Sequence, residues 1–238
     1  MPPSRPIPVR NRLLAALPPD TLAQLMPKFR RVPLVLRDVL CPPDAALEAV
    51  YFPEAGMVSM VAVLEEGMQA EVGLIGFEGM LGLSALSGNP VSFVEAVVQL
   101  SGTAWCMDIR EFRGELDASA ELRAMLLRYN DAQLSQVMQT AACNGRHDLE
   151  QRLARWLLMV HDRTPGDEML LTQEFMAVML GVHRPSITVT AGILQRAGLI
   201  RYAKGCVTVL DRASLEAASC ECYRAVTRRY AMLFPPPP

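Results

Sequence analysis

The fold is decided by one segment, residues 171–200, which read LTQEFMAVMLGVHRPSITVTAGILQRAGLI. Thr172 can cap the first turn of an apolar-faced helix, and Gly181 can end that helix in a left-handed turn. Pro185 suits the first turn of a second helix, where its missing N–H is not needed, and Gly198 ends that helix. Two helices joined by so short a glycine-containing turn predict a helix-turn-helix.

The residues that follow predict a hairpin. Residues 199–202 (LIRY) and 206–210 (CVTVL) are strand-like, and residues 203–205 (AKG) supply the turn between them. A helix-turn-helix followed directly by such a hairpin is a winged helix, whose second helix is expected to enter the major groove of DNA. An ordinary solvated helix face is the alternative interpretation, but the length of the whole pattern favours DNA binding.

Charge along the chain points to the same part of the protein. Residues 1–144 carry 11 Lys and Arg against 16 Asp and Glu, whereas residues 145–238 carry 12 against 9. Between His183 and Lys204 there are basic residues and no acidic ones. An anionic partner is therefore expected at the C-terminal third.

The N-terminal part has the pattern of a β-rich domain. Asn11 and the turn at residues 18–20 (PPD) should begin two short helices. From residue 32 to residue 107, short apolar runs such as 58–63 and 93–98 alternate with turn signals, as in a β-barrel or sandwich. No run reaches the length of about 18 apolar residues that a membrane span needs, and no apolar core follows the basic N-terminus, so a cytoplasmic protein is expected.

Residues 120–143 contain no Gly or Pro and predict one long helix, which Asn144 and Gly145 should end. A helix longer than about 30 Å cannot bury both faces against a small barrel. Its spare face is expected to pack on the same helix of a second subunit, although a helix lying across the barrel is the alternative. The expected interface residues are Leu122, Met125, Leu126, Tyr129, Gln133 and Val137.

These observations give an α+β fold with three parts. Residues 1–118 are expected to form a β-barrel sensor domain with flanking N-terminal helices, and residues 119–144 the long dimerisation helix. Residues 145–238 are expected to form the winged helix-turn-helix domain that binds DNA.

This order of elements resembles the Crp/Fnr family of bacterial transcription regulators. Residues 171–174 (LTQE), 179–182 (MLGV) and 193–200 (ILQRAGLI) carry the resemblance in the winged helix, and residues 77–83 (FEGMLGL) look like a degraded form of the family's ligand cassette. The resemblance implies a jelly-roll, cyclic-nucleotide-binding-like barrel and a homodimer on a palindromic operator in double-stranded DNA. It also implies RNA polymerase as a further partner and no enzymatic activity.

The resemblance assigns DNA contacts as well. Thr172 and His183 should lie near phosphates, and Arg184 and Val189 at base-reading positions. Pro185 and Val189 replace a Glu and an Arg that read bases in the family, so we expect a different operator. The full set expected at DNA is Thr172, His183, Arg184, Ser186, Thr188, Val189 and, at the wing tip, Lys204.

The ligand cassette departs from a cyclic-nucleotide site. The family's ribose-binding Glu and phosphate-binding Arg correspond to Met80 and Val91, and only the following Ser92 is retained. Without the cation a buried phosphate would be unpaired, so cyclic AMP is not expected as the effector. Together with Gly79 and Leu81 these residues form the candidate effector pocket, and both the effector and any cofactor stay unknown.

The six cysteines do not form a recognised metal motif. An iron–sulfur member of the family needs clustered N-terminal cysteines, but only Cys41 precedes residue 100, and a haem would need a barrel histidine that the sequence lacks. Cys220 and Cys222 offer two thiols, which is half a zinc site, and small packing residues would look the same. No metal site is assigned.

A DNA-binding transcription regulator is the main hypothesis. The alternative is a ligand-binding or protein-interaction module that no longer binds DNA specifically, which the replaced Glu and Arg of the recognition helix support. An enzyme is not expected, because the sequence shows no Ser/His/Asp or Cys/His arrangement, zinc motif or Gly-rich phosphate loop.

Overall fold

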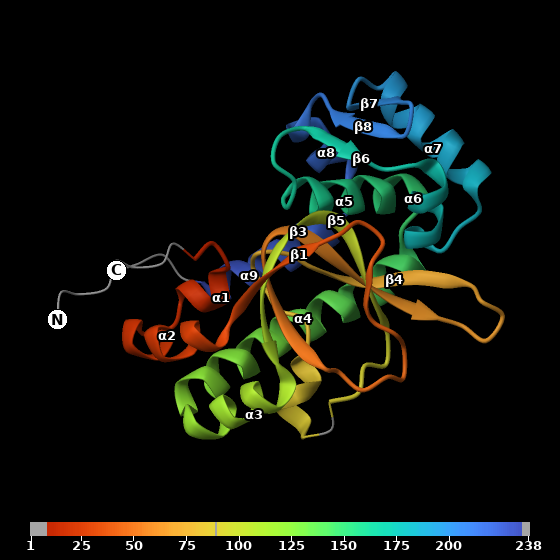
Figure 1. Ribbon diagram of the computed structural model, residues 1–238. Helices are drawn as coiled ribbons and strands as arrows, with labels where there is room; N and C mark the ends of the chain where they lie inside the picture. The colour runs from red at the N-terminus through yellow and green to blue at the C-terminus, as the bar shows by residue number, and fades with distance from the viewer. Residues whose placement is uncertain (1–8, 89, 235–238) are drawn as a thin grey trace.

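The computed structural model describes residues 9–88 and 90–234. The helical C-terminal domain lies over the β domain, and one long helix runs along the β domain toward it (Figure 1). The elements of the β domain are α1 (Arg12–Ala15), α2 (Pro19–Leu25), the 3-10 turn η1 (Met26–Lys28), β1 (Arg30–Leu34), β2 (Val39–Cys41), β3 (Ala49–Val63), β4 (Gln69–Ile75), η2 (Leu83–Ser87), β5 (Glu95–Asp108) and α3 (Ile109–Ala118). The remaining elements are α4 (Ala120–Arg146), α5 (Leu149–His161), β6 (Glu168–Leu170), α6 (Gln173–Leu180), α7 (Arg184–Arg196), β7 (Ile200–Ala203), β8 (Cys206–Val209), α8 (Arg212–Ala218) and α9 (Cys222–Leu233).

The β domain is one antiparallel sheet with the strand order β1-β5-β3-β4, and β2 also pairs with β5. The long strands β3 and β5 pair along most of their length, with register shifts near Ala55 that bend the sheet. The backbones come so close there that a Cβ on Gly102 would lie 2.0 Å from the Ala55 carbonyl oxygen. The β-rich domain predicted from the alternating pattern is confirmed, and the pairing recorded for the described residues is that of a curled sheet open between β1 and β4.

The two short N-terminal helices are also confirmed, and Asn11 begins the first of them. Its side-chain oxygen accepts hydrogen bonds from the amides of Leu13 (3.1 Å) and Leu14 (3.2 Å). Its amide nitrogen donates to the carbonyl oxygens of Pro53 (3.0 Å) and Gly79 (2.8 Å). One buried side chain thus caps α1 and ties it to β3 and to the turn after β4.

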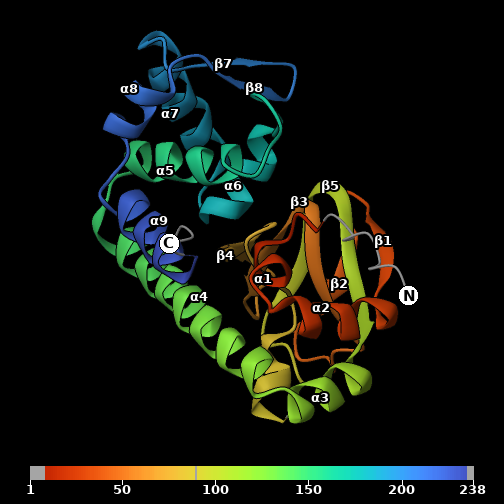
Figure 2. The same ribbon diagram turned by 90° about the vertical axis from the view of Figure 1, so that its left-hand side faces the viewer.

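Helix α4 begins at Ser119, whose hydroxyl accepts from the amide of Leu122, and it continues to Arg146. The expected helix end at Asn144 and Gly145 is therefore wrong: α4 runs three residues past residue 143, and both residues lie inside its last turn. Beside α4 lies α9, which the sequence pattern did not reveal (Figure 2). The aromatic rings of Tyr129 on α4 and Tyr230 on α9 meet with their centroids 6.4 Å apart.

The two domains share part of one apolar core. Met57, Val61 and Leu74 of the β domain belong to the same buried cluster as Trp156 of α5 and Leu180 of α6. The sheet therefore packs directly against the helices that carry the winged helix.

In the described part of the chain, no single helix is long and apolar enough to cross a membrane. Only α6 and α7 taken together reach the required length and composition, and these two helices are bent by 106° at the break between them.

Candidate nucleic-acid interface

The winged helix forms where the sequence predicted it. The hydroxyl oxygen of Thr172 accepts from the amide of Phe175 at 3.1 Å and so caps α6. Gly181 ends α6 with a φ of +62°, in the left-handed region that favours glycine. Pro185 stands in the first turn of α7, and the 106° bend between α6 and α7 is typical of a helix-turn-helix.

Helix α7 is held by one face and exposed on the other. Ile187, Ala191 and Leu194 are buried against the rest of the domain. The opposite face is open to solvent over its first two turns, and the exposed residues are His183, Arg184, Pro185, Ser186, Thr188 and Val189. The candidate DNA contacts on α7 therefore share one accessible surface.

Arg184 is exposed and only loosely paired. Its side chain is 65% exposed, and its Nε atom lies 4.0 Å from a carboxylate oxygen of Glu174, which is 71% exposed. A solvent-exposed pair at that distance contributes little, so the guanidinium can exchange it for a bidentate bond to guanine.

Thr188 has a partner within the chain. Its hydroxyl donates to Oε1 of Gln173 at 2.7 Å, so it connects the recognition helix to the start of α6. The amide of Gln173 in turn donates to the Tyr202 hydroxyl at 3.3 Å, and the Tyr202 amide donates to Oε1 of Gln195 at 2.7 Å. The two glutamines, which no sequence pattern indicated, thus connect the wing to α6 and α7.

Strands β7 and β8 form the wing with Ala203 opposite Cys206. Lys204 and Gly205 make the turn with φ values of +49° and +78°. Lys204 is exposed at the wing tip, and Arg196 at the end of α7 and Arg201 in β7 are exposed as well. The surface expected to face phosphates is thus basic on both the helix and the wing.

The candidate effector residues are brought together in part. Met80, Leu81, Val91 and Ser92 all line a cavity of about 290 Å³ in the β domain, whereas Gly79 does not. Instead, Gly79 lies against Tyr129, and a Cβ at this position would lie 2.1 Å from the tyrosine oxygen. Within the described part of the chain, no residue that lines this cavity is charged.

The residues expected at the dimer interface lie inside the subunit. Leu122, Leu126 and Tyr129 are fully buried, and Met125 and Gln133 nearly so. Gln133 and the half-buried Val137 line the effector cavity. The stripe chosen from the sequence is therefore the face of α4 that packs on its own β domain and on α9, and it offers little surface to a second subunit.

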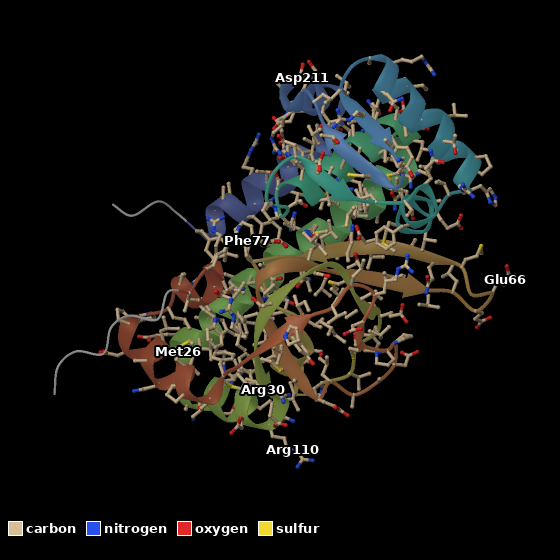
Figure 3. All side chains as sticks on the ribbon, turned by 45° about the horizontal axis from the view of Figure 1, so that its top comes forward. Met26, Arg30, Glu66, Phe77, Arg110 and Asp211 are labelled. Carbon is tan, nitrogen blue, oxygen red and sulfur yellow. The ribbon has the colours of Figure 1, made fainter. Side chains whose placement is uncertain are left out.

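Two buried carboxylates connect the β domain to the C-terminal domain. Glu78 accepts from Nε (2.9 Å) and Nη2 (2.5 Å) of Arg163, and each of these side chains is only 8% exposed. Figure 3 labels the neighbouring Phe77, which lies at this domain boundary. Glu71 of β4 accepts from the Trp156 indole at 2.8 Å and from the Ser59 hydroxyl at 2.7 Å.

Burial raises the pKa of Glu71 from 4.5 to about 7, although hydrogen bonds from Ser59 and Trp156 and the charges of Arg155 and Arg163 lower it. The folded protein therefore holds a proton between about pH 4.5 and about pH 7 that the unfolded chain releases. The contribution of protonated Glu71 to the free energy of unfolding is therefore fully present below about pH 4.5 and is lost as the pH rises through about 7.

We expect Glu71→Gln to flatten the pH dependence of the unfolding free energy across this window and to raise it at about pH 8 by about 1–3 kcal/mol relative to the parent. Urea unfolding of both proteins between about pH 5 and about pH 8 measures the difference. If the unfolding free energies of parent and variant change with pH in the same way, Glu71 does not titrate in this range.

Comparisons with known proteins agree with this geometry. Residues 151–218 match the Crp-like helix-turn-helix domain family. FixK2 from Bradyrhizobium japonicum is similar over 81% of this chain and 98% of its own, with 15% identity and a TM-score of 0.69. A Crp/Fnr-family regulator from Eubacterium rectale covers 87% and 96% of the two chains at 20% identity and a TM-score of 0.67. TTHB099 from Thermus thermophilus, a regulator of the CRP family, covers 80% and 96% at 21% identity and a TM-score of 0.65.

No curated protein matches the chain. The geometry of α6, α7 and the wing agrees with the matched helix-turn-helix domain. Residues 151–218 thus match a Crp-like helix-turn-helix domain, and the fold of the chain is similar to that of solved Crp/Fnr-family regulators. The resemblance seen in the sequence is confirmed for the helix-turn-helix domain and for the fold.

Proposed function

We propose that the protein is a cytoplasmic homodimer that binds a palindromic operator through α7 and the wing, and that its effector pocket does not accept cyclic AMP. The proposal rests on the exposed first two turns of α7, where the Arg184 side chain is largely exposed and only loosely paired with Glu174. Two recognition helices about 34 Å apart would enter successive major grooves, and RNA polymerase is the further partner expected of such a regulator.

Arg184→Ala should lower the affinity for an operator selected from random-sequence DNA by about 1–3 kcal/mol and relax the preference at one base pair. The reason is that a bidentate contact to a base is lost. Electrophoretic shifts on operator and on random DNA measure the effect, and equal losses on both would mean that Arg184 touches only phosphate.

Lys204→Ala provides the matched control on the wing. It should weaken binding to all sequences alike and reduce the slope of affinity against salt concentration by about one unit, because one phosphate contact is removed. If the parent protein shows no preference among sequences at all, then the alternative of a protein-interaction module gains support, since Pro185 and Val189 have no polar group with which to read a base.

The dimer seam that we propose is the face of α4 opposite to its own β domain. We call it the outer stripe, and its exposed members follow one another at alternating steps of four and three residues. This is the spacing of a two-stranded coiled coil. The stripe consists of Ala120, Ala124, Leu127, Asp131, Leu134, Met138, Ala141 and Gly145, and Leu127, Leu134 and Met138 are 51%, 47% and 61% exposed.

The uncharged cavity argues for a small apolar effector, if one is bound. The Ser92 hydroxyl already donates to the Val94 carbonyl oxygen at 2.7 Å, so it has little left to offer a ribose or phosphate. We therefore expect cyclic AMP at millimolar concentration to shift neither the melting temperature nor the DNA affinity. A ligand at 100 times its Kd stabilises a protein by about 2.7 kcal/mol, so a thermal scan would reveal binding, and a rise of several degrees would refute this part of the proposal.

A further inference from the structure

Three cysteines and one histidine meet where the end of α4 passes the start of α9. Cys143 lies in the last turn of α4 and His147 is its cap, whereas Cys220 precedes α9 and Cys222 is the first residue of α9. The sulfur atoms of Cys143 and Cys220 are 3.5 Å apart, and the sulfur of Cys222 lies 3.6 Å from Nδ1 of His147. All four potential ligand atoms lie within 4.8 Å of one another.

These separations fit four ligands around one ion. Zinc bonds of about 2.3 Å to sulfur and about 2.0–2.1 Å to nitrogen place tetrahedral ligand atoms about 3.5–3.8 Å apart. A disulfide between Cys143 and Cys220 would instead require their sulfurs to lie about 2.05 Å apart, much closer than the observed 3.5 Å. The cysteines are almost completely buried, and thiolates and imidazole are ligands that select zinc.

The surroundings support the ligands in the manner of a metal site. The second ring nitrogen of His147, Nε2, lies 3.3 Å from a carboxylate oxygen of Glu221, and metal-bound histidines usually donate their other N–H to such a group. The side-chain amide of Gln139 donates to the Cys222 sulfur at 3.0 Å.

We propose that Cys143, His147, Cys220 and Cys222 bind one Zn²⁺ ion in a closed tetrahedral site that fastens α9 to α4. Four protein ligands leave no open position, which is the arrangement of structural and not catalytic zinc. The ion would hold together the two segments that flank the DNA-binding helices, at the junction where α4 passes into the C-terminal domain.

Metal content of the full-length, untagged protein, purified with reductant and without chelator, tests the proposal. We expect about one zinc per chain by mass spectrometry in the parent protein. Cys206→Ser should keep the zinc, because Cys206 lies in the wing outside the cluster, whereas Cys143→Ser and Cys222→Ser should lose it. Glu221→Gln should weaken zinc binding by about 10–100-fold, because it removes only the partner of His147.

Cobalt provides a second, spectroscopic readout. Removing zinc with a chelator and adding Co²⁺ to the parent protein should give the intense visible bands of tetrahedral cobalt with thiolate ligands, and His147→Cys should keep tetrahedral binding with shifted bands. The proposal is overturned if the parent contains no zinc and gives no such bands while all its thiols are free. It is equally overturned if mild oxidation joins Cys143 and Cys220 in a disulfide and no metal competes with that reaction.

Discussion

Replacing Leu134 by Glu should turn the protein into folded monomers at micromolar concentration and reduce operator affinity by about 100-fold or more. Leu134 lies in the middle of the outer stripe, and in a dimer it would face its own copy. Two carboxylates in that desolvated seam would repel each other, and a single winged helix makes only half of the DNA contacts. Sedimentation velocity and an operator titration measure the two effects.

Two further variants make this test specific. Leu64→Glu changes a leucine of similar exposure, 56% against 47%, at the tip of the hairpin between β3 and β4, and it should leave the dimer intact. Leu126→Glu, on the face that the sequence favoured, should damage folding itself, because this side chain is fully buried inside the subunit. A parent protein that is monomeric, or a Leu134→Glu variant that stays dimeric, would exclude the outer stripe as the interface.

Removing one partner of the buried pair between Glu78 and Arg163 should have the second large effect. Glu78→Ala leaves the Arg163 guanidinium buried without its carboxylate, and breaking such a pair costs about 3–5 kcal/mol. For a chain of this length, the melting temperature should fall by roughly 10 °C. Thermal and urea unfolding of parent and variant measure the loss.

Replacing both partners separates the ion pair from its surroundings. The double variant Glu78→Met with Arg163→Met should recover most of the stability, because two apolar side chains need no partner charge. Glu168→Ala, which breaks the exposed pair with Arg201 at 3.8 Å, should cost less than about 1 kcal/mol. Equal losses from Glu78→Ala and Glu168→Ala would show that water reaches the buried pair.

The winged helix could be predicted from the sequence because its signals are local. The cap at Thr172, the left-handed end at Gly181 and the proline in the first turn of α7 each act within a few residues of their own position. The turn at Lys204 and Gly205 follows the same rule. Such signals do not depend on what the rest of the chain does.

The sequence could not predict which face of α4 is buried inside the subunit, because apolar residues occupy both sides of this helix. Leu126 and Leu127 are neighbours in the sequence, yet one is fully buried and the other is half exposed. The difference arises from the docking of the β domain and of α9, whose contact through Tyr230 comes from about 100 residues further along the chain. The same docking brings Cys143 and His147 to Cys220 and Cys222, so the sequence showed only half of that cluster.

The core shared by the two domains determines whether they unfold together or separately. Since Met57, Val61 and Leu74 pack among the buried residues of α5 and α6, separating the domains would uncover apolar surface on both. Calorimetry should therefore show one cooperative heat-absorption peak instead of two, and limited proteolysis should not release a stable C-terminal fragment. A winged-helix domain expressed alone would expose the apolar surface that packs against the sheet in the full protein. We therefore expect the whole chain to be the smallest unit that folds independently.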